Sequence, residues 1–395
     1  MVNSSTMTLI VIVMAIYFIG MIAISWMGRK YGKNFDDFIS AGRNCTTLMI
    51  IGSAVGSHIG NGYVVGGAAS GAAVGLSGAW YGIGCALSYL AVALVLNHRV
   101  YKCGYISLPE ILNARYGEKM TSVIFSVTTA LSYIANIAAQ LMAGKALFEA
   151  LGFNGTLGVW VIAVVVMAYS CISGLWGACA TSVVQVAIII VSLLATFFIV
   201  LGRGAFGLVT EAVANGLAPA SYFDMGADGI AAILITIVPI SLASLCEQCT
   251  VQRITSAKSE KTSFRALILS VVIMIPCALM PAFIGMYGYV LFGDTTNSVF
   301  FKVALDVLPS FFAALLIAAV VAAIMSTIDT MFVAFSTIIM HNIYRGMINP
   351  DASEGTLKKG DFACHLFLTV GAAVIALQFS SILDLLGAMY RFCAA

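Results

Sequence analysis

The chain has 395 residues, of which 61% are hydrophobic and only 9% are charged, and its mean hydropathy is +1.03. A soluble domain carries about 25% charged residues. These charges are therefore too few to cover a water-exposed surface, and the chain is predicted to lie in a lipid bilayer. The net charge of +2 and the lack of a basic patch interleaved with aromatic residues exclude nucleic acid as a partner.

Runs of apolar residues recur along the whole sequence. About 20 such residues span a bilayer as a helix. The first run has no basic residues before it and is too long for the apolar core of a cleavable signal peptide. We predict ten membrane-spanning helices and no strands, with the helices near residues 7–27, 46–73, 76–97, 121–144, 157–174, 179–201, 229–249, 266–291, 309–341 and 362–380.

Lysine and arginine residues are distributed unequally between alternate loops. One set of loops holds only Lys145, Arg203 and Lys302. Because basic residues are retained in cytoplasmic loops, we predict an N-terminus outside and basic loops in the cytoplasm of a multi-pass protein of the cell membrane. The basic set contains Arg29, Lys30, Lys33, Arg43, Arg99, Lys102, Arg115, Lys119, Arg253, Lys258, Lys261, Arg265, Arg345, Lys358 and Lys359.

Two of the predicted spans look interrupted. The second contains a small-residue series at Gly52, Gly56 and Gly60, which allows close helix contact and makes unwinding easy. The seventh contains Pro239 followed by a polar stretch at 241–248. The two spans are five apart in order, so they start on opposite sides of the membrane. Interrupted helices in corresponding positions are typical of secondary transporters built from inverted repeats, which we place at 46–202 and 227–395.

Three ionisable residues fall inside predicted spans, where charge is costly and usually functional. They are His58, Glu247 and Asp329. His58 could instead bond a carbonyl freed by the broken helix, and Glu247 could be solvated near the end of its span. A merely solvated role is harder to sustain for Asp329, which lies deep in the ninth span.

Asp329 belongs to a polar cluster in the ninth span. Helical spacing places Ser326, Thr327 and Thr330 on one side, above the small Ala323. Back-bonding to the preceding turn explains one hydroxyl, but three hydroxyls and a carboxylate within five residues suggest a binding site. Since hard cations take oxygen ligands, hydroxyls here and carbonyls of the broken second span could hold a monovalent cation. This pattern alone does not separate Na⁺ from H⁺.

Five ordered segments resemble the sodium:solute symporter family, which includes proline, pantothenate and sugar symporters. They are residues 322–330 (AAIMSTIDT), 241–256 (SLCEQCTVQRITSAKS), 173–185 (SGLWGACATSVVQ), 39–44 (ISAGRN) and 104–117 (GYISLPEILNARYG). The resemblance implies an all-α membrane protein with a LeuT-like, inverted five-plus-five core behind one extra N-terminal helix, 7–27. It also implies transport by alternating access.

The resemblance carries particular residues with it. The sodium site of the family would be formed here by the carbonyls of Gly56, Ile59 and Ala323 and the hydroxyls of Ser326 and Thr327. The family's contacts to its solute would correspond to His58, Asn61, Gly62, Tyr63, Gln140 and Glu247.

The sequence departs from the family pattern in three places. Ser182 stands where some members have an aspartate that helps to bind a second sodium, and Asp329 with Thr330 could compensate. Gly62 and Tyr63 replace the polar side chains that sugar symporters use, which disfavours a sugar. Residues 380–395 resemble the beginning of the last core helix, so we expect the second repeat to be incomplete and the chain to be C-terminally truncated.

The predicted function is sodium-coupled import of a small polar organic solute. Positive ends of half-helices favour a carboxylate and Glu247 favours an amine, so an amino acid, a related zwitterion or a carboxylate is expected. A proton-coupled transporter of the same fold, a channel and a transporter-like sensor are alternatives. An enzyme is not expected, because the sequence has no His-Glu-x-x-His motif, nucleophile elbow or facing carboxylate pair. The sequence leaves the oligomeric state open.

Overall fold

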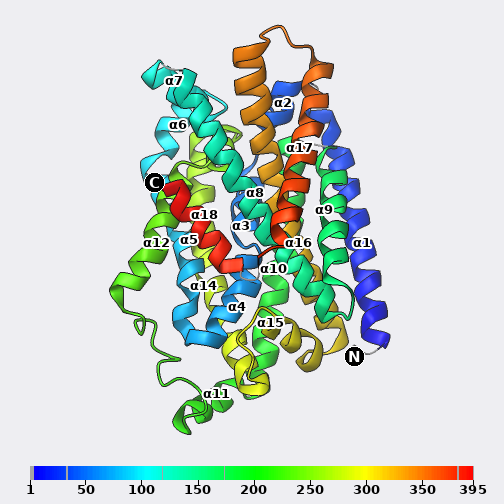
Figure 1. Ribbon diagram of the computed structural model, residues 1–395, viewed down its shortest axis with the longest axis vertical. Helices are drawn as coiled ribbons and strands as arrows, with labels where there is room; N and C mark the ends of the chain where they lie inside the picture. The colour runs from blue at the N-terminus through cyan, green and yellow to red at the C-terminus, as the bar shows by residue number, and fades with distance from the viewer. Residues whose placement is uncertain (1–3, 33, 118, 173, 380–381, 395) are drawn as a thin grey trace.

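The structure is a computed structural model that describes residues 4–32, 34–117, 119–172, 174–379 and 382–394. Within these residues the chain is helical throughout, and its β-structure is a single isolated bridge between Cys45 and Ala257. The helices stand roughly side by side as one elongated bundle (Figure 1). The prediction of an all-helical protein is confirmed.

The first half of the chain contains one long helix, a broken helix and then four further helices of 16 or more residues. The α-helices are α1 (Ser4–Gly28), α2 (Phe35–Ser40), α3 (Thr47–His58), α4 (Asn61–Val74), α5 (Trp80–Val95), α6 (Asn97–Cys103), α7 (Leu108–Tyr116), α8 (Lys119–Ala150), α9 (Gly155–Ser170) and α10 (Gly174–Gly202). Short 3-10 turns lie at η1 (Arg29–Tyr31), η2 (Ala41–Arg43) and η3 (Gly75–Ala79).

The second half also contains a broken helix. It comprises α11 (Ala205–Ala214), α12 (Gly229–Leu245), α13 (Gln248–Thr255), α14 (Glu260–Phe292), α15 (Ser298–Lys302), α16 (Ser310–Ser336), α17 (Glu354–Ala376) and α18 (Ile382–Ala394). Two segments with π-helical bonding extend α15 and α16, namely η4 (Val303–Val307) and η5 (Thr337–Ile348).

All ten predicted spans coincide with helices, but not every one is a single long span. Among the described residues seven helices are long and apolar enough to cross a membrane, or eight if the bent pair α12–α13 counts as one. The difference has two causes. The break at Ile59–Gly60 leaves α3 with only 12 residues, and α9 has 16.

Both predicted interruptions are present. The first lies between His58 and Asn61, and the second bends the chain by 53° between Leu245 and Gln248. Pro239, however, lies inside α12 and does not end it. Membrane helices tolerate proline because neighbouring groups can satisfy the freed carbonyl.

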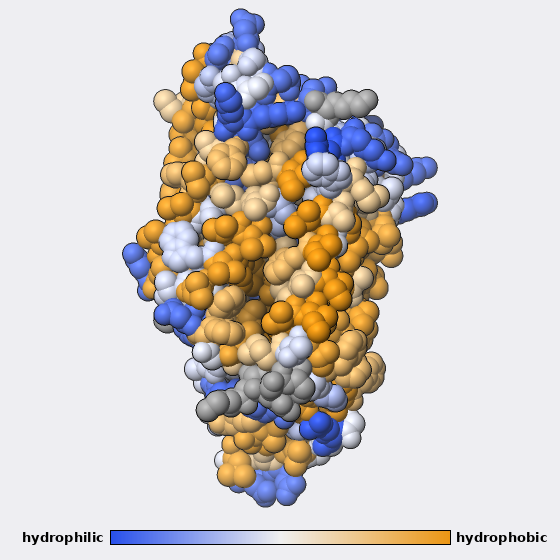
Figure 2. Space-filling view, turned by 90° about the vertical axis from the view of Figure 1, so that its right-hand side faces the viewer, coloured by the Kyte–Doolittle hydropathy of each residue, from blue (hydrophilic) through white to orange (hydrophobic). Residues whose placement is uncertain are grey.

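The outer surface matches a lipid environment. Apolar residues cover the middle of the molecule, while hydrophilic residues gather mainly at its two ends (Figure 2). Large apolar side chains such as Ile16, Ile19 and Trp26 of α1 are more than 60% exposed. Lipid contact explains this exposure, because it would be unfavourable in water.

The interior is held together by very close helix contacts at glycines. A Cβ on Gly52 would lie 2.8 Å from the backbone nitrogen of Val183 in α10. A Cβ on Gly285 of α14 would overlap the carbonyl oxygen of Ala68 in α4. These contacts bring backbones together as small residues do in membrane proteins, and they confirm the interpretation of the small-residue series in the second span.

Figure 1 also shows how the ends of the bundle differ. The segments α2, α6, α7 and η5 lie at one end, which carries most of the basic loops and which we call the basic end. The segments α11 and α15 lie at the opposite end. Helix α16 packs against α1, α3, α8 and α10 and is almost wholly buried, so its polar residues face protein rather than lipid.

Candidate functional site

The first helix break lies at Gly60, which is in close contact with α8 on one side and α16 on the other. Ile59 has φ −75° and ψ 52°, and Gly60 is extended, so the helical hydrogen bonding stops and restarts here. A Cβ on Gly60 would lie 2.9 Å from both Gln140 Oε1 and Thr327 Oγ1. The break is therefore held between α8 and α16, which is where a ligand-binding joint is expected.

Four of the five predicted sodium ligands meet at this break. Ser326 Oγ donates to the carbonyl oxygens of Gly56 (2.7 Å) and Ala323 (3.2 Å). Thr327 Oγ1 donates to Ala323 O (2.9 Å) and also lies 3.4 Å from Gly56 O. It lies 3.3 Å from the carbonyl oxygen of Ser57, which the sequence analysis did not include. All of these are oxygen atoms, the ligand type that hard cations take.

The fifth predicted sodium ligand, Ile59, is placed less directly. Its amide donates to Val55 O at 2.7 Å and thereby ends α3. Among the described hydrogen bonds, none joins its carbonyl to the hydroxyls of Ser326 or Thr327. The set that is assembled therefore links α3 to α16, and it suits a monovalent cation of low charge density.

The residues suggested for a second cation are not brought together. Ser182 Oγ donates to Ala178 O (2.7 Å) within α10, and Thr330 Oγ1 donates to Thr327 O (3.0 Å) within α16. Asp329 instead accepts hydrogen bonds from Tyr169 and Ser170 at the end of α9. The two α9 residues were missed, because nothing in that apolar stretch marks them as partners of a carboxylate.

Asn61 and Gln140, both predicted to contact the solute, hold one another. Gln140 Oε1 accepts from the Asn61 amide N–H (3.0 Å) and from Asn61 Nδ2 (3.2 Å). Gln140 Nε2 donates to Asn136 Oδ1 one turn earlier in α8 (3.2 Å). This chain of amides leads from the first break along α8, and Asn136 was not anticipated.

His58, Gly62 and Tyr63 face other neighbours. His58 Nδ1 lies 2.7 Å from the hydroxyl of Tyr89 in α5, and Tyr63 donates to the carbonyl of Met274 in α14. Gly62 is covered by the side chain of Leu386 in α18. His58 thus interacts with a tyrosine hydroxyl and with the backbone carbonyl of Ala54 one turn earlier in α3.

A buried guanidinium lies beside the same break. Arg253 of α13 is 1% exposed and donates to Ser53 Oγ (3.1 Å), Ser57 Oγ (2.5 Å) and Tyr89 OH (3.1 Å). Arg253 therefore ties the second broken helix to the first through three hydroxyl groups, and no carboxylate forms an ion pair with it among the described residues.

A cavity of about 330 Å³ adjoins the second break. It lies between α8, the α12–α13 joint and α18, and its size is within the range of small-molecule sites. Glu247 is its one charged residue among those described, and Thr250 Oγ1 lies 3.4 Å from that carboxylate. Its other polar lining residues are Thr128, Thr129, Ser132, Tyr133, Asn136 and Ser244. Because Asn136 belongs to both features, the cavity continues from the amide chain of the first break.

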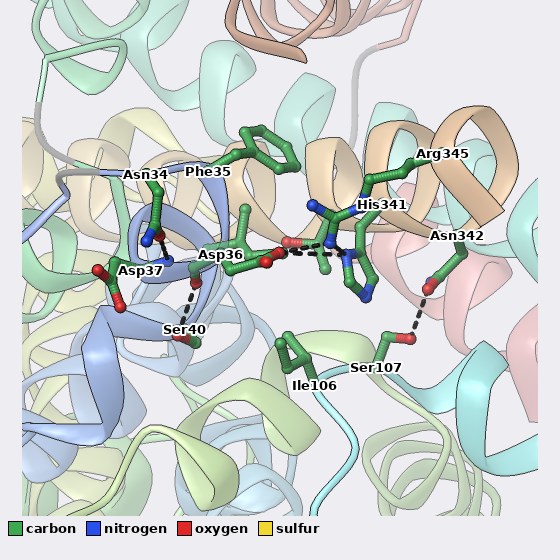
Figure 3. A network of polar contacts seen from close by, with 12 residues as sticks. Asn34, Phe35, Asp36, Asp37, Ser40, Ile106, Ser107, His341, Asn342 and Arg345 are labelled. Carbon is green, nitrogen blue, oxygen red and sulfur yellow. Dashed lines mark hydrogen bonds and ion pairs between the residues drawn. The ribbon is translucent and has the colours of Figure 1, made fainter. Parts of the chain in front are cut away.

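At the basic end a network of ionic groups joins three segments (Figure 3). We call Asp36, Glu110, His341 and Arg345 the loop network. Arg345 Nη2 lies 2.5 Å from both Asp36 Oδ1 and His341 Nδ1, and His341 Nε2 lies 2.6 Å from Glu110 Oε1. The network connects α2, α7 and η5, which are far apart in sequence.

The loop network is stabilised by charge. Burial alone would raise the pKa of Glu110, but hydrogen bonds from His341 and from the amides of Ile106 and Ser107 outweigh burial and lower it. Helix α7 is also tied to α13, because Gln248 Oε1 accepts from the Leu108 amide at 2.8 Å. These contacts close the basic end.

The opposite end contains a large cavity. It has a volume of about 1000 Å³ and lies between the end of α8 and the segments α15 and η4. Charged residues line it, namely Lys145, Glu149, Lys302 and Asp306. The cavity beside Glu110 and His341 at the basic end is smaller, about 110 Å³.

This bundle has two broken helices, an oxygen-lined joint and a small cavity, a combination that is typical of secondary transporters. The chain belongs to the sodium:solute symporter family, whose model matches residues 38–394. Both the family resemblance and the LeuT-like fold predicted from the sequence are confirmed.

Characterised relatives are similar at a modest level. The chain is 24% identical to the sodium/proline symporter of Escherichia coli over 378 residues, covering 89% of this chain and 73% of that protein. It is 24% identical to the high-affinity proline transporter of Bacillus subtilis, covering 90% and 78%. It is also 24% identical to sodium/glucose cotransporter 1 of Oryctolagus cuniculus, covering 90% and 61%.

Solved structures share the fold. A substrate-bound, outward-open Na⁺-coupled sialic acid symporter superposes with a TM-score of 0.84 at 18% identity, covering 97% of this chain and 85% of that one. A nucleobase-cation-symport-1 family transporter in a closed conformation gives 0.63 at 14% identity, covering 90% and 76%. Family membership and this fold support sodium-coupled symport of a small molecule by a multi-pass membrane transporter, and the relatives are not enzymes.

Proposed function

We propose that this protein imports a small amino acid or a related zwitterion together with one Na⁺. The observation that carries the proposal is the meeting of Ser326 and Thr327 with the Gly56 carbonyl across the first helix break. Na⁺ at this point would be held by Gly56, Ile59, Ala323, Ser326 and Thr327. The scattered positions of Ser182, Asp329 and Thr330 favour a single sodium site.

Sodium binding would act through the joint between α3 and α16. The two hydroxyls that now donate to carbonyls would turn their lone pairs toward the ion, so the ion replaces these hydrogen bonds as the tie between the two helices. A solute that binds better when this tie is formed also raises the affinity for Na⁺ by the same factor. That reciprocity is the basis of coupled transport.

The solute would occupy the cavity beside Glu247. The carboxylate of Glu247 would pair with an ammonium group of the solute, since charge-assisted hydrogen bonds are about twice as strong as neutral ones. Asn136, Gln140 and Asn61 would bind the polar remainder, and the positive ends of α4 and α13 favour a carboxylate. His58, Gly62 and Tyr63 would shape the joint. The names of the proline-transporting relatives agree with a zwitterion.

We place the basic end in the cytoplasm and the N-terminus outside. In this orientation the large cavity near Lys145 and Lys302 opens outward and the loop network closes the cytoplasmic side. The two inverted repeats would be 46–202 and 227–395, and α1 would be the additional helix.

Uptake by purified protein in liposomes tests the coupling. Accumulation of labelled amino acids is measured with an inward Na⁺ gradient and with choline in its place, at one fixed pH. We expect uptake only with sodium. Equal uptake without sodium would refute sodium coupling and favour the proton-coupled alternative, and non-saturable flux would favour a channel.

The solute class is tested by thermal shift, because ligands that bind the native state raise its stability. Amino acids, carboxylates without an amine, and nucleosides are screened at saturating Na⁺. We expect stabilisation by amino acids in wild-type protein and its loss in Glu247→Gln, with Glu149→Gln in the other cavity as a matched control. Stabilisation by plain carboxylates that survives Glu247→Gln would overturn the zwitterion assignment.

A further inference from the structure

Three buried polar atoms that lack a hydrogen bond of ordinary length lie together where α17 packs against α16, and Ser336 faces the Asp361 carboxyl group there. They are Asp361 Oδ1, His365 Nε2 and Ser336 Oγ, and their residues are 4%, 0% and 0% exposed. A buried polar group without a hydrogen bond costs about 1–3 kcal/mol, and a charged one more. Eight such atoms occur in the described part of the chain, so three at one helix contact call for an explanation.

The geometry fixes the state of His365. Its Nδ1 lies 2.7 Å from the carbonyl oxygen of Asp361 and 3.6 Å from Asp361 Oδ1. Nδ1 therefore carries a hydrogen and donates to the carbonyl. A second hydrogen on Nε2 would be a buried, charged donor with no acceptor among the described residues, which costs more than a bare acceptor, so the neutral ring fits this contact. The ring lies against Phe332, with centroids 4.6 Å apart. A neutral imidazole in apolar surroundings cannot neutralise an ionised Asp361.

Among the described residues no lysine or arginine forms an ion pair with Asp361, and Lys358 and Lys359 of the same helix are exposed. Helix α17 packs against α2, α8, α9, α16 and η5. Asp36 of α2 and His341 and Arg345 of η5 belong to the loop network, and α8 has no charged residue between 120 and 144. The groups that interact electrostatically with Asp361 are His365, Cys364, Cys171 at the end of α9 and Ser336, and Asp329 also acts on Cys171.

The number of oxygen atoms decides between a metal cation and a proton. Calcium and magnesium take about six or more oxygen ligands, and the sodium site proposed above has five. This contact offers only one carboxyl group and the Ser336 hydroxyl. A proton needs a single oxygen. We propose that Asp361 binds a proton at this contact, that the neutral acid is the form in which α16 and α17 pack, and that Ser336 and His365 line the site.

The proton site is separate from the sodium site but shares a helix with it. Ser336 follows Thr327 by nine residues in α16, about 14 Å along the helix axis. Loss of the proton would place a carboxylate in a dry helix contact, at high cost, and would loosen α17 from α16. Packing around the sodium ligands of α16 therefore depends on pH. The link between the Asp361 proton and the sodium site rests on the proposed function. Proton binding by Asp361 itself does not.

Difference infrared spectroscopy tests the protonation directly, since a neutral carboxyl group absorbs apart from a carboxylate. Wild-type protein is compared at neutral pH with Asp361→Asn and with Asp306→Asn, an exposed aspartate at the opposite end. We expect a neutral-acid band in wild type and in the control that is lost in Asp361→Asn and unaffected by Na⁺. An unchanged band in Asp361→Asn, or a band that appears only when Na⁺ is removed, overturns the proposal.

Thermal stability gives a second measurement without transport. Asparagine has nearly the shape of the neutral acid, so Asp361→Asn should fold and match wild type only at acid pH, where the unfolded chain also carries the Asp361 proton. Above the pKa of an aspartate in an unfolded chain, wild type must take up a proton to fold, so its stability should fall as pH rises. Asp361→Asn should lack this component of the loss and be the more stable of the two near neutral pH. Failure of Asp361→Asn to fold, or a lower stability than wild type at every pH, would show that the ionised carboxylate is required and would refute a proton site, while leaving sodium-coupled uptake untouched.

Discussion

Replacing Thr327 with valine removes one oxygen from the proposed sodium site and keeps the branched shape of the side chain. Thr327 Oγ1 is within 3.4 Å of the Gly56 and Ser57 carbonyls, so the hydroxyl is at the centre of the joint. A hydrogen bond or similar contact to a charged partner contributes about 1.5–3 kcal/mol. Because each 1.4 kcal/mol is tenfold, the sodium concentration for half-maximal uptake should rise roughly 10- to 100-fold.

The assay is the dependence of initial uptake on Na⁺ in liposomes of equal protein content. Thr196→Val is the matched control, since Thr196 is buried and donates to Ser192 O (2.8 Å) of its own helix, away from the joint. We expect the control to keep the wild-type sodium dependence. If Thr327→Val transports with unchanged sodium dependence, Thr327 is not a ligand and the assigned site is wrong.

Three further outcomes follow from contacts elsewhere in the bundle. Gly285→Ala should destabilise the protein by about 1–3 kcal/mol or more, because its Cβ would overlap the Ala68 carbonyl; Gly202→Ala, with nothing within 4 Å, should keep the wild-type melting temperature. Gln140→Leu should reduce uptake strongly while Na⁺ still stabilises the protein, because Asn61 loses the Gln140 Oε1 acceptor beside the cavity. Normal uptake would show that Gln140 does not belong to the solute site. Because the pKa of Glu110 is lowered in the folded protein, its contribution to stability is fully present above the ordinary pKa of 4.5. That contribution is lost as pH falls through the lowered pKa of the folded state. Acid melting curves of Glu110→Gln should lack this loss, and curves that superpose on wild type would contradict it.

The fold could be predicted well from the sequence because lipid imposes a simple rule. Every long apolar run had to be a helix, and glycine at 56 and 60 marked where one of them breaks. The residues proposed to bind sodium could also be found from the sequence, since Ser326 and Thr327 are adjacent in a recognisable segment. The second break lies in the polar stretch after Pro239 and not at the proline itself, because a membrane helix can accommodate proline when its neighbours compensate.

The missed residues share one property, which is that their roles arise from contacts between distant segments. Tyr169 and Ser170 bind a carboxylate 159 or more positions away. Glu110 and His341 are 231 positions apart. Each of these is unremarkable in its own segment. Helical periodicity describes which face of a helix a residue occupies, but it does not say which helix covers that face.

Arg253 has a consequence for the electrical behaviour of the transporter. Its guanidinium is a permanent positive charge inside the bundle, bound only to hydroxyl groups among its described hydrogen bonds. Moving one elementary charge fully across the membrane involves about 2.3 kcal/mol per 100 mV. A rearrangement that shifts α13 along the membrane normal moves this charge together with Glu247 at the start of the helix. The return of the empty carrier would therefore respond to voltage to the extent that these two side chains travel different distances across the membrane field.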